Sequence, residues 1–228
     1  MTAPDQKPWI KVCGNTNLDD AKLAVELGAS ALGFIFAPSP RRITPIEASR
    51  IIQHIDPAVE TIGVFVNQPP SVILASASRA GLSGVQLHGD EDPNMVGTLL
   101  ALARRQKTEL KIYKAVRMTI IDDSFKWDVE ASKLLAGMLL DSGTPVQRGG
   151  TGRQFDWDEA APLVRILARR AKIIIAGGLN PQNVSRALAL FQPWGLDVVS
   201  GVESKPGKKD PTKLRAFFDA VYGVPQGK

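Results

Sequence analysis

The stretch WIKVCGNTNLDDAKLAVELGASALGFIF, residues 9–36, contains the pattern that decides the fold. It begins with an apolar run, Trp9–Cys13, continues with an amphipathic segment, Leu18–Leu27, and ends with a second apolar run, Ala31–Phe36. Short runs rich in Val, Ile and Phe are typical of strands, and the apolar spacing between them is that of a helix. Asn17, directly before Leu18, is a favourable helix N-cap. The stretch therefore predicts a unit of strand, helix and strand.

The same change between strand-like apolar runs and helix-like apolar spacing recurs along the chain. Gly, Pro, Asn or Asp marks each boundary between them. Eight apolar runs predict strands at Trp9–Cys13, Ala31–Phe36, Thr61–Asn67, Gly84–His88, Lys111–Arg117, Gly137–Asp141, Ala171–Gly177 and Gly195–Gly201. Eight amphipathic segments predict helices at Leu18–Leu27, Pro45–His54, Ser71–Ala80, Pro93–Arg105, Ser124–Ala136, Trp157–Arg170, Pro181–Phe191 and Pro211–Tyr222. Cap or first-turn residues open several of these helices, at Asn17, Thr44-Pro45, Asn180-Pro181 and Asp210-Pro211.

Strict alternation of strands and helices predicts an α/β fold with parallel strands and right-handed crossovers. Eight such units close most naturally into a single (β/α)8 TIM barrel. The rival is a doubly wound open sheet, which usually has fewer strands. We expect the barrel to span residues 9–223, with an N-terminal extension at 1–8 and a C-terminal tail at 224–228.

The composition is that of a globular protein, and a small anionic substrate would account for its charge balance. The chain has 228 residues, 44% of them hydrophobic, and a formal net charge of +5. Its basic residues are scattered rather than gathered in a patch, which argues against nucleic acid as a partner. No apolar run reaches the roughly 20 residues of a membrane span, and residues 1–7 lack the apolar core of a signal peptide. We expect a cytoplasmic protein that does not bind membranes.

Strand parity predicts which side chains face the barrel interior, because successive side chains in a strand point to opposite faces. In the first strand the apolar pair Ile10 and Val12 should face the helices, which turns Lys11 and Cys13 inward. The same argument turns Gln86 and His88 inward in the fourth strand. In the sixth strand it turns Asp141 inward, because Met138 and Leu140 pair outward. Cys13, His88 and Asp141 would then share the C-terminal mouth, where barrel enzymes place their chemistry.

Cys13 and Asp141 have both structural and catalytic interpretations. Cys13 is the only cysteine, so it forms no internal disulfide, and a lone thiol is most often a small buried hydrophobe. As a general base its thiol would need a lowered pKa, which Lys11 could supply. Asp141 could be a helix cap or part of an ion pair, or a carboxyl kept protonated in a dry mouth as a general acid. His88 is a second candidate base.

Two glycine-containing turns predict a phosphate site. Gly177-Gly178 ends the seventh strand and Ser200-Gly201 ends the eighth. Many barrels bind phosphate through the backbone N–H groups of the loops after these two strands. The alternative is that the glycines serve only the tight turns.

Two further loops lie at the expected mouth. Arg41 and Arg42 follow the second strand, and one of them could hold a carboxylate by paired hydrogen bonds. The other is expected to be solvated. The glycine-rich segment Gly149–Gly152 is predicted to be a mobile lid, although a phosphate nest or a flexible connection would have the same composition.

The sequence predicts neither a metal nor a cofactor. One cysteine and two histidines far apart in sequence do not form a metal-ligand cluster. No nucleophile elbow or glycine-rich dinucleotide fingerprint follows a strand.

Taken together, these motifs resemble the phosphoribosylanthranilate isomerase family of tryptophan biosynthesis. The resemblance rests on Lys11–Gly14, Gly33–Phe36 with Ser39-Pro40-Arg41, Gly63–Asn67, Val85–Glu91, Leu139–Asp141, Gly149–Trp157, Gly177–Val184 and Asp197–Glu203 with Pro206–Asp210. These segments occur in order from residue 9 to about residue 218, and only the fifth strand unit contributes none.

The resemblance implies a TIM barrel of the ribulose-phosphate-binding type and an Amadori rearrangement of N-(5-phosphoribosyl)anthranilate without cofactor. It assigns the general base to Cys13, the general acid to Asp141, and the substrate carboxylate to Arg41. The phosphate falls on Gly178, Ser200 and Gly201. Asn15 departs from the family pattern, which usually has an aliphatic residue there, and could alter the surroundings of the thiol.

Two other interpretations stay open on sequence alone. The related isomerase of histidine biosynthesis has aspartates after its first and fifth strands and a twofold repeat, whereas this chain has Cys13 and no evident repeat. A barrel that binds a phosphoribosyl ligand without catalysis is the other interpretation, and the presence of both Cys13 and Asp141 argues against it. The sequence is compatible with a monomer or a homodimer.

Overall fold

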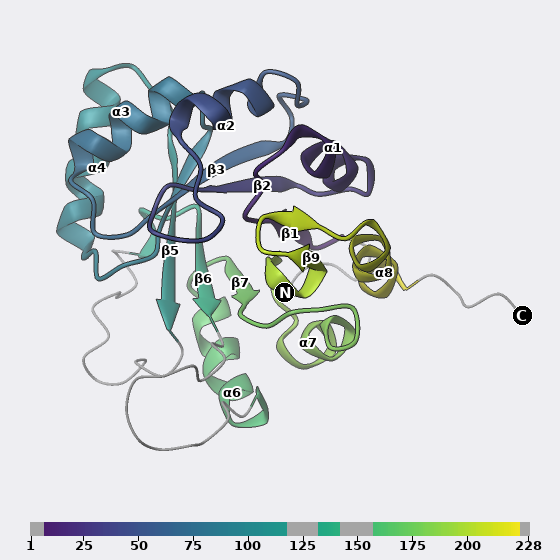
Figure 1. Cartoon of the computed structure of the whole chain (residues 1–228). Helices are drawn as coiled ribbons and strands as arrows, with labels where there is room; N and C mark the ends of the chain where they lie inside the picture. Colours follow the sequence, from purple (N-terminus) through teal and green to yellow (C-terminus); the bar gives the residue numbers. More distant parts are fainter. Residues whose placement is uncertain (1–6, 118–131, 142–156, 224–228) are drawn as a thin grey trace, which may run out of the picture.

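The predicted (β/α)8 barrel is confirmed. In the computed structural model, which describes residues 7–117, 132–141 and 157–223, eight parallel strands close into a barrel in sequence order, and β8 pairs with β1. The helices lie outside the strands (Figure 1). The strands are β1 (Trp9–Val12), β2 (Ala31–Ile35), β3 (Glu60–Phe65), β4 (Gly84–Leu87), β5 (Lys111–Arg117), β6 (Gly137–Asp141), β7 (Ile173–Ala176) and β8 (Gly195–Val198).

The helices of the described residues follow the predicted order. They are α1 (Leu18–Glu26), α2 (Pro45–Ile52), α3 (Pro70–Ala80), α4 (Pro93–Arg105), α6 (Trp157–Ala168), α7 (Val184–Phe191) and α8 (Pro211–Tyr222). Asn17 caps α1, Thr44 forms a capping box with Glu47 at α2, and Asp210 caps α8. Side-chain oxygens at these positions satisfy N–H groups that have no acceptor within the helix. The helix expected at Ser124–Ala136 falls mostly outside the described residues, as does the glycine-rich segment Gly149–Gly152.

Helix α7 begins at Val184, three residues later than the predicted start at Pro181. The Asn180 side chain accepts hydrogen bonds from the N–H groups of Gln182 and Asn183, and the Asn183 side chain accepts one from the N–H of Asn180. Asn side chains compete with helix formation in this way. The prediction that Asn180 caps the helix is therefore wrong, because its side chain closes a turn instead.

The segment after β8 contains a hairpin that the sequence did not predict. A short 3-10 turn, η2 (Ser200–Val202), leads into β9 (Glu203–Lys205), which pairs antiparallel with β10 (Lys208–Lys209). The predicted eighth strand, Gly195–Gly201, therefore ends earlier, at Val198.

Burial confirms the predicted strand parity. Ile10, Val12, Val85, Leu87, Met138 and Leu140 belong to the large apolar cluster that packs the strands against the helices. A smaller cluster fills the barrel interior and includes Ala31, Ile62, Tyr113, Leu139 and Ile174. At the end where the strands begin, Trp9 stacks on Tyr113 and Trp194.

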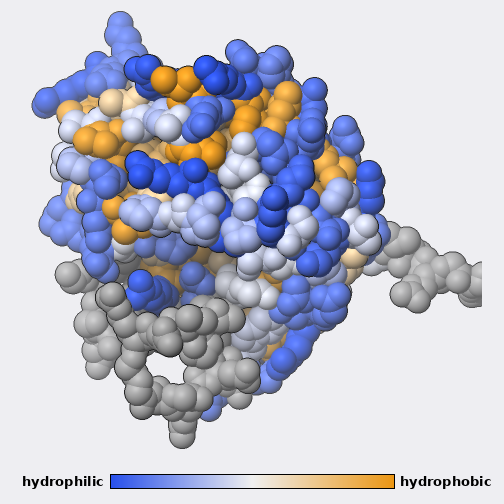
Figure 2. Space-filling view, in the orientation of Figure 1, coloured by the Kyte–Doolittle hydropathy of each residue, from blue (hydrophilic) through white to orange (hydrophobic). Residues whose placement is uncertain are grey.

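The surface mixes apolar and polar residues on the face shown in Figure 2. Exposed apolar side chains include Ile46 on α2 and Val72 on α3. None of the described helices combines the length and apolar character needed to cross a membrane.

An ion pair lies inside the barrel where β1 meets β8. Lys11 and Asp197 are register partners on these strands, and Lys11 Nζ lies 2.6 Å from Asp197 Oδ1, with both side chains buried. Parity predicted that Lys11 points inward, but it did not identify this partner. A buried charge is tolerated when it is paired and costly when its partner is removed.

We predict that Asp197→Leu lowers the free energy of unfolding by about 3–5 kcal/mol, because it leaves the Lys11 ammonium group buried without its carboxylate. Lys11→Met combined with Asp197→Leu should recover most of that loss. Urea unfolding followed by circular dichroism measures both variants. A single variant as stable as the unsubstituted chain, or a double variant no better than the single one, would contradict the prediction.

Candidate active site

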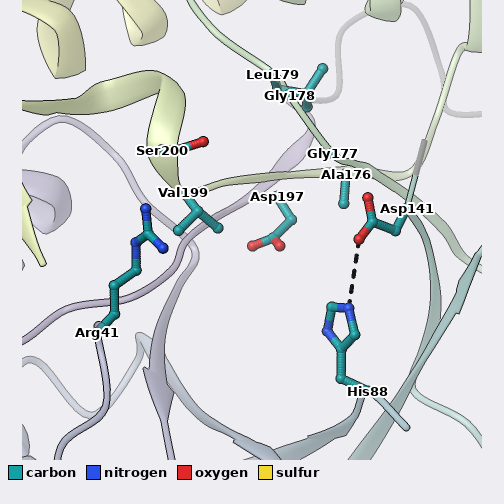
Figure 3. Close-up of a pocket in the computed structure, with 10 residues that line it drawn as sticks. All are labelled: Arg41, His88, Asp141, Ala176, Gly177, Gly178, Leu179, Asp197, Val199 and Ser200. Carbon is teal, nitrogen blue, oxygen red and sulfur yellow. Dashed lines mark ion pairs between the residues drawn. The ribbon is translucent and has the colours of Figure 1, made fainter. Parts of the chain in front are cut away.

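A cavity of about 310 Å³ opens at the C-terminal ends of the strands (Figure 3). Its walls come from β4, β6, β7, β8 and the loop after β2. The lining residues are Arg41, His88, Asp141, Ala176, Gly177, Gly178, Leu179, Asp197, Val199 and Ser200. Four of the predicted site residues, Arg41, Asp141, Gly178 and Ser200, thus meet around one space. Cys13 and Gly201 lie beside the cavity rather than among its lining residues.

Asp141 ends β6 and faces His88, which follows β4. The distance from His88 Nε2 to Asp141 Oδ2 is 3.6 Å, and the two side chains point toward one another in Figure 3. Gln86 Nε2 lies 2.8 Å from His88 Nδ1 and donates to it, so the proton of a neutral His88 ring is on Nε2. His88 therefore directs an N–H toward the carboxylate. The Asp141 side chain is 28% exposed.

Cys13 directly follows β1 and is 3% exposed. Its N–H donates to the carbonyl of Val198 on β8, at 2.9 Å. On the other side the thiol fills the space that Gly33 leaves, because a Cβ added to Gly33 would lie 2.5 Å from Sγ. The missing side chain at Gly33 thus makes room for the sulfur between β1 and β2.

The sequence left the pKa of Cys13 open, and Lys11 alone does not lower it. Burial raises the pKa of this thiol above its ordinary value. The Lys11 and Lys209 ammonium groups act in the opposite direction, but the Asp197 carboxylate adds to the increase. Burial also lowers the pKa of Lys11, and the Asp197 carboxylate and the thiol more than compensate and raise it. Lys11 therefore keeps its positive charge beside the sulfur, but its ammonium group also pairs with the Asp197 carboxylate.

Asn15 is buried and bridges β1 to β2. Its side-chain amide donates to the carbonyls of Val12, at 2.8 Å, and Gly33, at 3.2 Å. Its own N–H also donates to Gly33 O. Among the described residues, no donor reaches its buried Oδ1. An aliphatic residue here would lack these two side-chain bonds, so Asn15 fixes the backbone around Gly33 and thereby the pocket that holds the thiol.

The two predicted phosphate turns lie against each other. A Cβ added to Gly201 would collide with the carbonyl oxygen of Leu179 and would lie 2.9 Å from Asn180 Cβ. Asn180 and Asn183 donate to the Gly178 carbonyl, at 3.3 and 3.0 Å, and hold its loop. Ser200 and Gly201 open η2, so their N–H groups have no acceptor within it. The turns after β7 and β8 therefore form one continuous wall at this end of the cavity.

Arg41 lies across the cavity from Asp141 and His88 in Figure 3. Its guanidinium Nε and Nη2 atoms donate to the carboxylate of Glu203, at 2.7 to 3.0 Å. The neighbouring Arg42 is exposed, as expected for one of the two arginines. The hydrogen bonds and the charge of Glu203 raise the pKa of Arg41, so this side chain is a fixed cation at the cavity wall.

The arrangement has known relatives. A family model described as N-(5'phosphoribosyl)anthranilate (PRA) isomerase matches residues 10–220. The chain belongs to this family. It is 43% identical over 210 residues to the N-(5'-phosphoribosyl)anthranilate isomerase of Pelobacter propionicus, covering 92% of this chain and 93% of the relative. The corresponding protein of Geobacter sulfurreducens is 40% identical, with 94% and 98% covered.

Solved structures agree with this assignment. The crystal structure of phosphoribosyl anthranilate isomerase from Thermotoga maritima has a TM-score of 0.80 and 37% identity, and the match covers 95% of this chain and all of that one. A second structure of such an isomerase, in complex with reduced 1-(o-carboxyphenylamino)-1-deoxyribulose 5-phosphate, has a TM-score of 0.77 and 35% identity, with 95% and 100% covered.

Three residues at this candidate site were not among the predicted site residues. Asp197 lines the cavity. Strand parity puts it on the same face of β8 as Gly195, and this could have revealed its inward direction. Glu203 and Lys209 approach Arg41 and Cys13 from the β9–β10 hairpin, where no periodic pattern marks them. Among the described residues, no three His, Cys, Asp or Glu side chains are grouped as a metal site would need.

Because Cys13 is the only cysteine, the difference in ultraviolet absorbance between the unsubstituted chain and Cys13→Ala reports on its thiolate, with the contribution of the two tyrosines subtracted. We predict a titration midpoint above the ordinary thiol value of about 8.5. Asp197→Asn should lower that midpoint, because it removes a negative charge beside the thiolate. A midpoint at or below the ordinary value, or an increase in the Asp197→Asn variant, would contradict this account of the thiol.

We predict that Gly201→Ala weakens the binding of inorganic phosphate by about tenfold or more. The added methyl group would push the two turns apart. A backbone N–H group displaced in this way loses its charge-assisted hydrogen bond to the phosphate. Isothermal titration calorimetry measures the change. Gly97→Ala is the matched control, since a Cβ there meets no atom within 4 Å. Equal phosphate affinity in the two variants would show that the turns do not form the anion site.

Proposed function

We propose that the protein converts N-(5'-phosphoribosyl)anthranilate into 1-(2-carboxyphenylamino)-1-deoxy-D-ribulose 5-phosphate, an Amadori rearrangement of tryptophan biosynthesis. Family membership over residues 10–220 is the observation that carries the proposal. The cavity supports it, because a carboxyl, an arginine and two turns at the β7 and β8 ends surround one space. The rearrangement moves only protons and electron pairs within one molecule, so acid and base groups are sufficient chemistry.

In the first half of the reaction Asp141 is the general acid. It donates a proton to the ring oxygen of the ribose while the anthranilate nitrogen pushes its lone pair toward the anomeric carbon. The bond between that carbon and the ring oxygen breaks, and a protonated Schiff base forms. For this role Asp141 must carry a proton, and His88 Nε2 faces its carboxyl at a distance of 3.6 Å.

In the second half Cys13 is the general base. Its thiolate removes the proton from the sugar carbon next to the Schiff base and gives an enolamine. The enolamine then takes a proton at the anomeric carbon and loses one from the neighbouring hydroxyl, which yields the ketose. Lys11 stabilises the thiolate, and the raised pKa makes the thiolate a stronger base once it has formed. The rate constant kcat/KM should therefore increase as the pH rises toward the pKa of Cys13.

The two ends of the substrate are held by different groups. Arg41 would bind the anthranilate carboxylate through paired hydrogen bonds. The N–H groups of Gly178, Ser200 and Gly201 would bind the phosphate. Support for this assignment comes from the cavity, which Arg41, Gly178, Ser200 and Asp141 all line.

We propose further that the enzyme acts in the cytoplasm on this small phosphorylated substrate, without nucleic acid or membrane, as a monomer or a homodimer. The family includes a protein from Thermotoga maritima that is described as dimeric and from which monomers were generated.

The experiment that tests the mechanism compares Cys13→Ala and Asp141→Asn with the unsubstituted enzyme. Each variant should lose about 10²–10⁴-fold in kcat, the contribution expected of a general acid or base. Binding of the reduced product analogue, measured by calorimetry, should largely survive. Arg42→Ala, which changes an exposed arginine, is the control.

Near-normal turnover in either variant would contradict the assigned roles. Complementation of a tryptophan auxotroph that lacks this isomerase tests the activity itself. If a well-expressed chain bound the analogue but did not restore growth, the protein would be a binding barrel rather than an isomerase.

A further inference from the structure

The Glu203 carboxylate connects the proposed substrate-binding arginine to the rest of the site. We propose that Glu203 is a positioning residue, which holds one edge of the Arg41 guanidinium so that the other edge faces the carboxylate of the substrate. This inference rests on the proposed function, in which Arg41 binds that carboxylate. Glu203 is not among the predicted site residues, although it ends Asp197–Glu203, one of the segments that carry the family resemblance.

The geometry at Arg41 divides the guanidinium into two edges. Both oxygens of Glu203 accept from Nε, at 2.9 and 3.0 Å, and Oε2 also accepts from Nη2, at 2.7 Å. Among the described residues, Nη1 has no hydrogen-bond partner. Since a guanidinium has five N–H donors in one plane, the edge formed by Nη1 and Nη2 can still bind a second carboxylate bidentately. Arg41 also lines the cavity, so this second edge is available to a ligand there (Figure 3).

The stem of Arg41 is confined as well. A Cβ added to Gly14 would lie 2.9 Å from Arg41 Cδ, so the side chain runs directly over the backbone next to Cys13. Confinement of the stem restricts where the guanidinium can lie, and Glu203 then sets the rotation of its plane. A bidentate contact depends on that rotation, because two parallel hydrogen bonds require coplanar groups.

Glu203 is itself rigidly held. Its Oε1 accepts from the N–H of Gly207 and from Lys209 Nζ, both at 3.2 Å. Lys209 is 1% exposed, and its Nζ also donates to the carbonyls of Cys13, at 2.5 Å, and Val199, at 3.5 Å. Asp20 on α1 accepts from the N–H of Lys209, at 2.7 Å. The hairpin therefore holds the Glu203 carboxylate and the Cys13 backbone with the same lysine.

The charges explain why two cations surround Glu203. Arg41 and Lys209 each carry a positive charge and Glu203 a negative one, so the three groups leave one positive charge for the ligand. An Arg41–Glu203 pair without Lys209 would be neutral and would attract a carboxylate less. Burial raises the pKa of Glu203, but Arg41 and Lys209 together lower it, so the residue is ionised.

The test measures recognition of the carboxylate separately from activity. The ligands are the reduced product analogue and its anilino counterpart, which lacks only the carboxylate, and calorimetry gives the ratio of their affinities. The unsubstituted enzyme should prefer the carboxylated ligand by on the order of tenfold to hundredfold, as expected for hydrogen bonds between charged groups. Arg41→Ala should abolish the preference.

Glu203→Gln separates positioning from charge because the two effects have opposite signs. The variant gains one net positive charge, so charge alone would increase the preference for the carboxylated ligand. Loss of positioning should instead reduce the preference by about tenfold, as a bidentate contact becomes a mobile one. Glu203→Asp, which keeps the charge, should recover part of the preference. An unchanged or increased preference in Glu203→Gln overturns the proposal.

Two further variants deal with folding. If Glu203→Gln is unstable because Lys209 is left without its carboxylate, Glu203→Gln combined with Lys209→Met removes both charges, and the same reduced preference is expected. Glu91→Gln is the matched control, because Glu91 also forms a buried ion pair, with Lys114, but does not contact Arg41. Its preference should equal that of the unsubstituted enzyme, and an equal loss there would assign the effect to stability and overturn the proposal.

Failure of the proposed function gives a different result. If Arg41→Ala keeps the full preference, Arg41 does not bind the substrate carboxylate, and the role of Glu203 falls with it. If Arg41→Ala loses the preference and Glu203→Gln keeps it, the function of Arg41 stands and only the positioning role is wrong.

Discussion

The closure of the barrel between β1 and β8 is the constraint on which the candidate site depends. Lys11 and Asp197 lie 186 positions apart in sequence, yet they pair inside the barrel at this junction. The N–H of Cys13 donates to Val198 one step further along. The junction thus brings the proposed base, which belongs to the first strand unit, beside the last loop of the barrel. Both η2, the proposed phosphate turn, and the Glu203 carboxylate reach the site only because the ends of the sheet meet here.

The charges at this junction have a chemical consequence. A buried ion pair stabilises little by itself, but Lys11 and Asp197 place a full positive and a full negative charge beside one thiol. Their effects on Cys13 oppose each other, and burial decides the direction, so the pKa is raised. The thiol is therefore mostly protonated at neutral pH, while the thiolate that does form is a strong base next to a fixed ammonium group. Reactivity depends on the balance between these neighbours rather than on a single activating lysine.

Periodicity in the sequence predicted the strands and their inward residues, whereas contacts between distant segments escaped prediction. Alternation along β1, β4 and β6 correctly turned Lys11, His88 and Asp141 inward, because one face of each strand is apolar and must pack against helices. The direction of the Cys13 pKa could not be obtained in this way, since it depends on burial and on Asp197 from another strand. The β9–β10 hairpin is short and polar, so no periodicity marked Glu203 or Lys209, although both lie in segments that carry the family resemblance. The start of α7 was missed because side-chain bonds of Asn180 and Asn183 replace the first helical turn.

The loop after β8 shows that the loops of this barrel are not independent modules. Its first turn, Ser200–Val202, packs against Leu179 and Asn180 of the neighbouring loop, at the proposed phosphate end. Its hairpin then places Glu203 on Arg41 at the proposed carboxylate end and Lys209 on the Cys13 carbonyl. A shift of this one segment would change the distance between the two anchors and the position of the base together. Because a near-attack geometry tolerates little displacement, the hairpin has to be rigid, and its ion pairs with Arg41 and Asp20 provide that rigidity.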